Sequence, residues 1–318
     1  MTAPLLSTVT RTQGSNRALK DRTVTPEGFG LDFVEVRVLV DAFRRMVRGL
    51  EFDVSEMAFT TYLCARSHGK RFTALPVFLV RGFHHGAVVR SARAGITHPK
   101  ELEGRRVGVN RGYTVTTGVW ARAVLQREYG VDLDQITWVL SGDEHVAEYQ
   151  PPRNVVPMPS GATLDGMLLD GELAAVVGAQ IDHPDVVPLL PDPTAAAFDA
   201  LRSRDWYPIN HLVVVRDDLL AAHPQLAPAL FEAFAEAKDR YVQRLRAGAI
   251  EQPTPTDEMY RQVMEVTGQD PLPYGIEPNR AMIEELLDQA VQQRILAAPP
   301  PVEPLFAPGT QHLVAATG

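Results

Sequence analysis

Short apolar runs alternate with amphipathic segments along the whole chain. The apolar runs are typical of strands, and the amphipathic segments show the three-to-four-residue spacing of helices. Strands are predicted at 5–10, 29–36, 52–54, 72–80, 87–90, 106–109, 136–140, 173–177 and 212–216. Helices are predicted at 16–21, 41–48, 56–67, 114–129, 164–170, 224–246 and 280–294. Strands that alternate with helices indicate parallel sheets covered on both faces.

Changes in composition divide this pattern into two lobes. A polar segment with a proline and a glycine spans 97–106, and the chain returns just before the strand at 212–216. We expect an α/β fold with a discontinuous first lobe, 1–94 and 208–318, and an inserted second lobe, 95–207. Such a protein places its ligand in a cleft between the lobes, at the C-terminal ends of strands and the N-termini of helices.

Prolines and one serine refine the prediction. Pro76 removes a backbone donor from the run 72–80, which limits this strand to the edge of a sheet or to a break. Ser55 suits the N-cap of a helix that begins at Glu56. The proline-rich segments 151–159 and 182–193 are expected to be connections.

Composition excludes several classes of protein. The 318 residues are 45% apolar and 22% charged, as in an ordinary globular protein, and the formal charge is 31 − 39 = −8. A general nucleic-acid binder is not expected, and an anionic ligand needs a local cluster of Arg or His. The single cysteine, Cys64, excludes an intramolecular disulfide. Because there is neither a signal-like N-terminus nor an apolar run of about 20 residues, we expect a cytoplasmic protein without a membrane span.

The segment 107–120 (VGVNRGYTVTTGVW) is the first candidate for chemistry. A strand ends there, Gly112 permits a tight turn, and hydroxyl residues open a helix, an arrangement that favours an anion. The candidate ligand-binding residues are Asn110, Arg111, Tyr113, Thr114 and Thr116. An ordinary capped turn between strand and helix explains the same pattern.

The segment 80–89 (VRGFHHGAVV) is the second candidate. His84 and His85 point to opposite faces if they lie on a strand, so one of them is able to face the cleft. Arg81 is suited to bidentate binding of a carboxylate. Ordinary structural histidines are the alternative.

The third candidate is WYPINH, residues 206–211, where the chain returns to the first lobe. Asn210 and His211 lie at this expected hinge, although His211 also suits a simple strand end. Glu56 is a fourth candidate, with a partner of the helix dipole as its structural alternative. The acidic turn at 143–148 lacks a matching second group of metal ligands, and no Gly-x-Ser-x-Gly, HExxH or GxGxxG motif occurs.

Several segments together resemble one family. They are EFDVSEM, PVFLVRGFHHG, 102–120, GELAAV, YPINHLVVVR, FEAFAEAK and DPLPYGIEPNR. In this order and over nearly the whole chain, they resemble the 4,5-dihydroxyphthalate decarboxylase-like proteins, which share the type II periplasmic-binding-protein fold. The resemblance implies non-oxidative decarboxylation of a hydroxylated aromatic acid, without an organic cofactor. The partner is then a small aromatic carboxylate.

Loss of CO2 from a phenolic acid requires protonation of the ring carbon that bears the carboxylate. His85 and His211 are the expected proton donors, since imidazole exchanges protons near neutrality, and Glu56 is expected to orient a histidine or to accept from a phenol. The expected substrate contacts are Arg11, Arg17, Arg81, His84, Asn110, Arg111, Tyr113, Thr114, Thr116 and Asn210.

Two other functions remain open. One is a substrate-binding protein of an ABC-type transporter for a small aromatic anion. The other is a different lyase on the same fold, such as a chorismate dehydratase, because one architecture hosts several activities. The sequence does not decide whether the chain forms a homo-oligomer or whether a divalent metal assists, and it shows no evident set of metal ligands.

Overall fold

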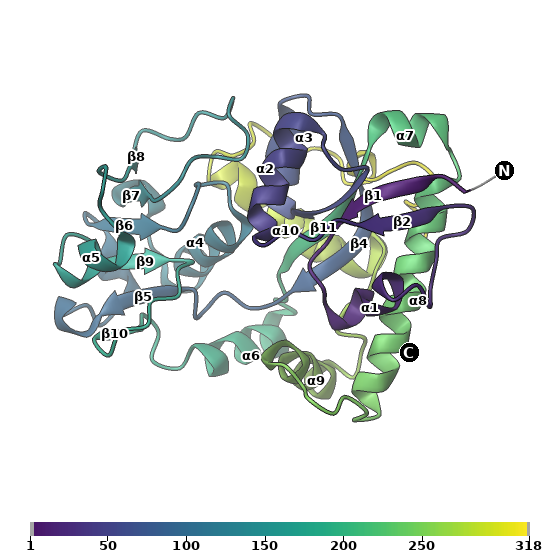
Figure 1. Ribbon diagram of the computed structural model, residues 1–318. Coiled ribbons are helices and arrows are strands. Elements are labelled where there is room, and N and C mark those ends of the chain that lie inside the picture. Colours follow the sequence, from purple (N-terminus) through teal and green to yellow (C-terminus); the bar gives the residue numbers. More distant parts are fainter. Residues whose placement is uncertain (1–2, 317–318) are drawn as a thin grey trace. The chain divides into compact units, whose positions relative to one another are not determined.

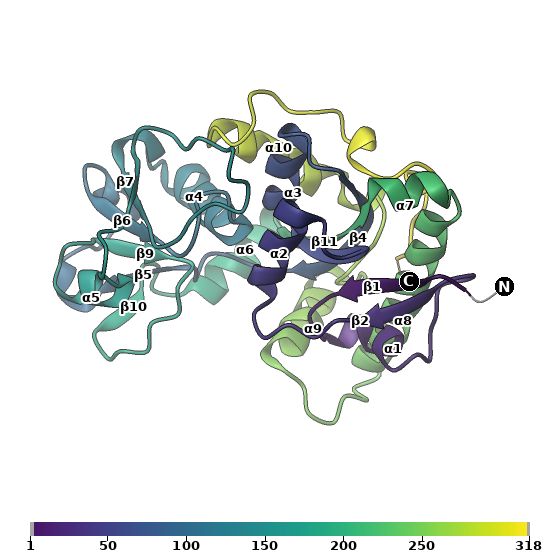
Figure 2. The same ribbon diagram turned by 45° about the horizontal axis from the view of Figure 1, so that its top comes forward.

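The computed structural model describes residues 3–316 and contains two compact units, each built around one sheet (Figures 1 and 2). The first unit comprises Met1–Gly82, Ile209–Glu285 and Pro300–Gly318, and the second comprises Phe83–Pro208 and Leu286–Pro299. In this division residues 83–94 and 286–299 belong to the second unit, whereas the sequence placed both segments in the first lobe.

The sheet of the first unit has the strand order β2-β1-β3-β11-β4. Its strands are β1 (Leu5–Val9), β2 (Gly30–Phe33), β3 (Val54–Ala58), β4 (Phe72–Arg81) and β11 (Ile209–Arg216). β1 pairs in parallel with β2 and β3, but β11 is antiparallel to both β3 and β4. The expectation of purely parallel sheets is therefore wrong. A parallel strand needs a connection back to the opposite edge, whereas β11 starts at the edge where β3 and β4 end.

Two local predictions for this sheet have opposite outcomes. β4 is an edge strand, as Pro76 predicted. Its proline carbonyl accepts a bond from the Gly275 N–H at 2.8 Å. The predicted N-cap at Ser55 is wrong, because Ser55 lies within β3 and the helix begins only at Phe59. All five residues of β3 are buried, which favours a central strand over the first turn of a helix.

Helices surround this first sheet. They are α1 (Arg17–Lys20), α2 (Leu39–Gly49), α3 (Phe59–Ser67), α7 (Asp217–Ala222), α8 (Leu226–Arg246) and α9 (Pro255–Thr267). α3 packs against β3, β11 and β4, and α8 packs against β4 and α1 (Figure 1). The sequence did not predict α9, although Thr254 caps it and Pro255 opens it, a combination typical of a helix start.

The sheet of the second unit has the order β10-β5-β9-β6-β7-β8. The strands are β5 (Val88–Ser91), β6 (Arg106–Val109), β7 (Thr137–Leu140), β8 (Val155–Pro157), β9 (Ala175–Val177) and β10 (Val186–Pro188). β6 is parallel to β7 and β9, while β5 is antiparallel to β9. β8 and β10 were predicted to be connections. Each is a three-residue edge strand that ends in proline, too short for a periodic signal.

Helices α4 (Thr116–Tyr129), α5 (Leu164–Leu169) and α6 (Pro193–Arg204) complete the second unit. α10 (Arg280–Gln292) continues from residues of the first unit into residues of the second. The core of the second unit includes the fully buried Trp120 and Trp138. Over residues 3–316, no helix combines the length and the apolar character that crossing a membrane requires.

Candidate active site

The candidate site of the first unit lies at one edge of its sheet. β3 and β4 end at this edge and β11 begins there, because His211 pairs with Ala58 of β3 and with Val80 of β4. Ile209 in turn pairs with Arg81 at the end of β4. The topology thus brings together five predicted residues: Arg11, which follows β1, and Glu56, Arg81, Asn210 and His211.

Glu56 and His211 form a direct pair at this edge. His211 Nδ1 lies 2.6 Å from Glu56 Oε1, and Glu56 Oε2 accepts a hydrogen bond from the Arg11 peptide N–H at 2.8 Å. The Glu56 side chain is 0% exposed. A carboxylate can only accept hydrogen bonds, so we assign the proton between the two side chains to Nδ1 of His211.

The other ring nitrogen of His211 is available to a ligand. Within residues 3–316 no hydrogen bond joins Nε2 to a partner, and the His211 side chain is 15% exposed. The Phe43 ring meets the imidazole edge-on at a centroid distance of 5.2 Å. The pair therefore has a buried, anchored end at Nδ1 and an accessible end at Nε2. The sequence had not indicated Phe43, because its apolar position on α2 predicts only core packing.

The other predicted residues of this unit differ in environment. The Arg81 guanidinium is buried and donates from Nη1 to Asn279 Oδ1 at 3.0 Å. Asn279 lies in the DPLPYGIEPNR segment and was not predicted as a site residue. Asn210 keeps a solvent-inaccessible Oδ1 for which residues 3–316 supply no hydrogen-bond partner. Arg11 and Arg17 are exposed, and Arg11 reaches the site through its peptide group.

His85 lies in the second unit in a different setting. Its side chain is 0% exposed, and its Nε2 lies 3.0 Å from Glu128 Oε1 on α4. The same carboxylate oxygen accepts from Arg204 at 2.6 Å. Burial alone would raise the pKa of Glu128, but the hydrogen bond and charge of His85 and the charge of Arg204 outweigh it and lower that pKa. This arrangement supports a structural ion pair, and a catalytic role for His85 stays a prediction. The neighbouring His84 is also buried.

Donors of the predicted anion-binding loop in the second unit bind a carboxylate of the chain itself. The peptide N–H of Tyr113 donates to Glu144 Oε1, and the peptide N–H of Thr114 donates to Glu144 Oε2 at 3.1 Å. The Thr114 hydroxyl adds a bond of 2.6 Å to the same oxygen. A Cβ at Gly112 would lie 2.6 Å from Glu144 Oε2, so only glycine allows this approach. An external anion that used these three donors would have to replace Glu144.

The remaining predicted residues of this loop serve its geometry. Asn110 donates through Nδ2 to the Gly178 carbonyl at 2.8 Å. The Arg111 peptide donates to Ser141 Oγ at 2.8 Å, and Arg111 itself has a φ of 74°, uncommon for a residue with a side chain. Thr116 is buried at the start of α4.

A buried arginine that the sequence did not single out lies beneath this loop. Arg122 donates from Nη2 to the Tyr113 carbonyl at 2.6 Å and from Nε to Gln293 Oε1 at 2.7 Å. Its guanidinium carbon lies 3.8 Å from the centre of the Tyr113 ring. Burial lowers the pKa of Arg122, and burial raises that of Tyr113. The one signal in the sequence was that Arg122 stands among apolar residues of the predicted helix. Taken alone, an arginine in the middle of a helix is expected to face solvent.

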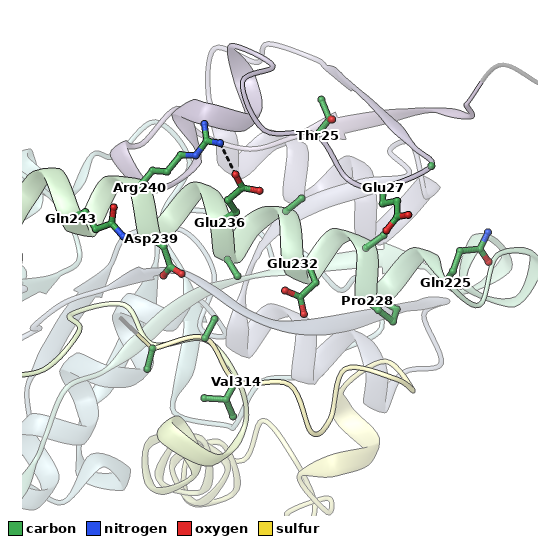
Figure 3. Close-up of a pocket in the computed structure, with 16 residues that line it drawn as sticks. Thr25, Glu27, Gln225, Pro228, Glu232, Glu236, Asp239, Arg240, Gln243 and Val314 are labelled. Carbon is green, nitrogen blue, oxygen red and sulfur yellow. Dashed lines mark hydrogen bonds and ion pairs between the residues drawn. The ribbon is translucent and has the colours of Figure 1, made fainter. Parts of the chain in front are cut away.

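A separate groove of the first unit has the wrong charge for an anion. It runs along α8 between residues 25–28 and the C-terminal segment at Val314 (Figure 3). Its acidic lining residues are Glu27, Glu232, Glu236 and Asp239. Arg240 is the cation of this lining, and it pairs with Glu236. Over the described residues, no group of three His, Cys, Asp or Glu side chains is placed to hold a metal ion.

The chain is similar in sequence to two curated proteins. The chain is 33% identical to a 4,5-dihydroxyphthalate decarboxylase of Comamonas testosteroni over 264 residues, which is 78% of this chain and 79% of the relative. It is 32% identical to a 4,5-dihydroxyphthalate decarboxylase of Pseudomonas putida over 180 residues, 52% of this chain and 69% of the relative. A scan against models of protein families found no match.

Solved structures of similar fold are more distant in sequence. The periplasmic aliphatic sulphonate binding protein SsuA of Escherichia coli aligns with a TM-score of 0.53 and 13% identity, over 94% of this chain and 90% of that chain. The desulfurization enzyme DSZB aligns with a TM-score of 0.55 and 13% identity, over 97% of both chains. The predicted type II periplasmic-binding-protein-like fold is thereby confirmed. Because this fold includes a binding protein and an enzyme, it does not by itself decide between the two functions.

Proposed function

The chain belongs to the 4,5-dihydroxyphthalate decarboxylase family, and on this premise we propose that it is a carboxy-lyase for a hydroxylated aromatic acid. The substrate class is a small aromatic carboxylate similar to 4,5-dihydroxyphthalate. The names of the two relatives support the reaction class. The residues at the edge of the first sheet support a mechanism in which a histidine protonates the substrate.

The observation that carries the proposal is the pair of Glu56 and His211. A buried carboxylate at Nδ1 fixes the ring and stabilises its positive charge, while Nε2 stays accessible. This is the arrangement that a general acid needs, because the donor atom must reach the substrate while the rest of the group stays oriented. A binding protein needs only hydrogen-bond donors and has no need of such a polarised imidazole.

The proposed reaction starts from the imidazolium form of His211. A phenol oxygen of the substrate increases the electron density at the ring carbon that bears the carboxylate, and Nε2 transfers its proton to that carbon. The bond between this carbon and the carboxylate carbon then breaks. Its electron pair returns to the aromatic ring, and CO2 leaves. His211 is left neutral, with its Nδ1 proton still hydrogen-bonded to Glu56. Its Nε2 then takes up a new proton from water.

A cation in the same unit completes the proposed site. Arg81 Nη1 donates to Asn279 Oδ1, a neutral acceptor, at 3.0 Å. We assign Arg81 to a carboxylate of the substrate, since a guanidinium binds carboxylates in a fixed geometry. The other predicted contacts stay predictions, and they are Arg11, Arg17, Asn210, His84, Asn110, Arg111, Tyr113, Thr114 and Thr116.

The test is CO2 release by the purified full chain from hydroxylated benzoates and phthalates. We expect turnover of at least one of these acids and a loss of about 10²- to 10⁴-fold in His211→Gln, the usual contribution of a general acid. His145→Gln is the control for loss of a buried imidazole at a position that is not a candidate residue, and it should keep full turnover. His85→Gln tests the separate prediction that His85 donates a proton. Unchanged turnover in His211→Gln would refute the assignment. Tight binding of an acid that is never consumed would instead favour the transporter-associated binding protein.

A further inference from the structure

We propose that Asn16 is a positioning residue for the Glu56–His211 pair. It acts through the peptide group of Arg11, which it orients toward Glu56. This inference rests on the proposed function. It extends the site to a residue that is hydrogen-bonded to neither Glu56 nor His211.

The side chain of Asn16 is completely buried and forms three hydrogen bonds with the loop that follows β1. Its Nδ2 donates to the Arg11 carbonyl at 2.7 Å and to Thr10 Oγ1 at 3.2 Å. Its Oδ1 accepts from the Gln13 peptide N–H at 2.9 Å. One amide therefore links Thr10, Arg11 and Gln13 of the loop. Rotation of the amide by 180° would exchange its oxygen and nitrogen and break these bonds, so its orientation is fixed.

Arg11 is consequently held at both of its backbone polar groups. Its carbonyl is bound by Asn16, and its N–H donates to Glu56 Oε2 at 2.8 Å. The N–H of Arg11 is the one hydrogen-bond donor that the described residues offer to Oε2, while Oε1 is used by His211. If the loop turned away, the buried carboxylate would lose one of its two bonds and would be free to rotate. Asn16 thus determines the orientation of the carboxylate that orients His211.

The segment that carries Asn16 is itself fixed to a long helix. Asn16 closes the short helical turn Gly14–Asn16, and a Cβ at Gly14 would lie 2.1 Å from the Tyr241 ring of α8. The Tyr241 hydroxyl donates to Asp257 at the start of α9. On the other side, Lys20 donates to the Thr10 carbonyl at 2.9 Å. The amide of Asn16 is therefore presented from a rigid support, as positioning requires.

The test compares Asn16→Asp with Asn154→Asp in the full chain. Asp keeps an oxygen for the Gln13 N–H but replaces the donor at the Arg11 carbonyl by a second acceptor. Asn154 is the matched control, because its Nδ2 also donates to two backbone carbonyls, those of Leu133 and Ile136, outside the site. We expect Asn16→Asp to lower kcat about 10- to 100-fold, less than loss of the acid itself. KM should stay unchanged, since Asn16 does not contact the substrate. Asn154→Asp should leave both constants unchanged.

A second readout does not depend on catalysis. The Nδ1 proton of His211, assigned by its absence in His211→Gln, should give a downfield proton NMR signal that shifts or is lost in Asn16→Asp and is unchanged in Asn154→Asp. If Asn16→Asp does not fold, Asn16→Ala removes the same donors without adding charge and carries the same expectation. An unchanged kcat, or a lower kcat with an unchanged His211 signal, would overturn the proposal. A wild-type chain without any turnover would refute the proposed function, while the NMR comparison would still decide the role of Asn16.

Discussion

Thr114 binds Glu144 twice, through its peptide N–H at 3.1 Å and through its hydroxyl at 2.6 Å, both to the same carboxylate oxygen. Donors of the loop after β6, among them the predicted Thr114, therefore bind a carboxylate from the loop after β7. Both loops follow the C-terminal ends of neighbouring parallel strands, where α/β sheets gather ligand-binding residues. An internal anion at this position ties the two loops together.

Removal of this anion should loosen both loops. We expect Glu144→Ala to lower the free energy of unfolding by about 1.5–3 kcal/mol, the range for hydrogen bonds to a charged group. The amides of Tyr113 and Thr114 should exchange with solvent faster, as hydrogen–deuterium exchange can measure. Glu172→Ala, which changes an exposed glutamate of the same unit, should stay within about 0.5 kcal/mol of the wild type. Unchanged exchange at Thr114 would contradict the role of Glu144.

Glu56 and His211 should behave as a unit in a double-mutant cycle. Because Glu56 acts by orienting and stabilising His211, Glu56→Gln should lower kcat strongly in the wild type and have little further effect in His211→Gln. The measurement is kcat for CO2 release in the two single variants and the double variant, with circular dichroism to confirm folding. Additive losses in the double variant would show that the two residues act independently.

A side chain at Gly14 should lower the stability of the protein. The Cβ of Gly14→Ala would overlap the Tyr241 ring, so we expect a loss of about 1–3 kcal/mol, the usual cost of overpacking. Gly49→Ala is the matched control, since nothing lies within 4 Å of a Cβ at this helical position. It should be neutral or stabilising by up to about 1 kcal/mol. Urea unfolding compares the two variants, and equal stabilities would contradict the close approach of Gly14 to α8.

The ion pair of Glu128 should contribute a pH-dependent stability. The pKa of Glu128 is lowered from its ordinary value of 4.5, so its contribution is fully present above about pH 4.5 and is lost as the pH falls through the lowered pKa. We expect Glu128→Gln to be about 1–3 kcal/mol less stable than the wild type at pH 7. The difference should shrink toward pH 3 in urea unfolding.

The control for Glu128 is Asp199→Asn. Asp199 pairs with Arg202, but its carboxylate is 75% exposed, and exposed pairs contribute little. Its effect should be small at every pH. A stability difference between Glu128→Gln and the wild type that stays constant from pH 7 to pH 3 would contradict the proposed ionised state of Glu128.

Segments with a clear apolar or amphipathic pattern were the predictable part of the fold. The strand at 106–109 has the predicted bounds, and the long helix near 224–246 and the strand near 212–216 are confirmed within a few residues. Short edge strands such as β10 were missed because three residues carry no period. The direction of β11 was also missed, since the order and direction of strands depend on packing between distant segments and leave no local pattern.

The candidate site was predictable as a set of residue types, and a contact between Glu56 and a histidine was one of the two roles expected for this carboxylate. Glu56 and His211 were both expected, and the structure pairs them. Their partnership depends on strand register across β3 and β11, which the sequence does not display. Asn16 was missed because a buried asparagine in a turn has no periodic or compositional mark. Glu144 was placed in an acidic turn and not predicted to bind the loop at 112–114. Its approach to that loop depends on the absence of a Cβ at Gly112, 32 residues earlier, and no local pattern shows this.

The insertion of β11 between β3 and β4 has a consequence for how the protein is made. Glu56 and His211 are 155 residues apart in the chain, and the strands on either side of β11 leave the ribosome long before it does. The place of β11 between β3 and β4 therefore stays empty until residues 83–208, the larger part of the second unit, have been synthesised. A chain released before β11 would have the Glu56 carboxylate but no imidazole beside it, so the pair forms only when the last strand joins the sheet.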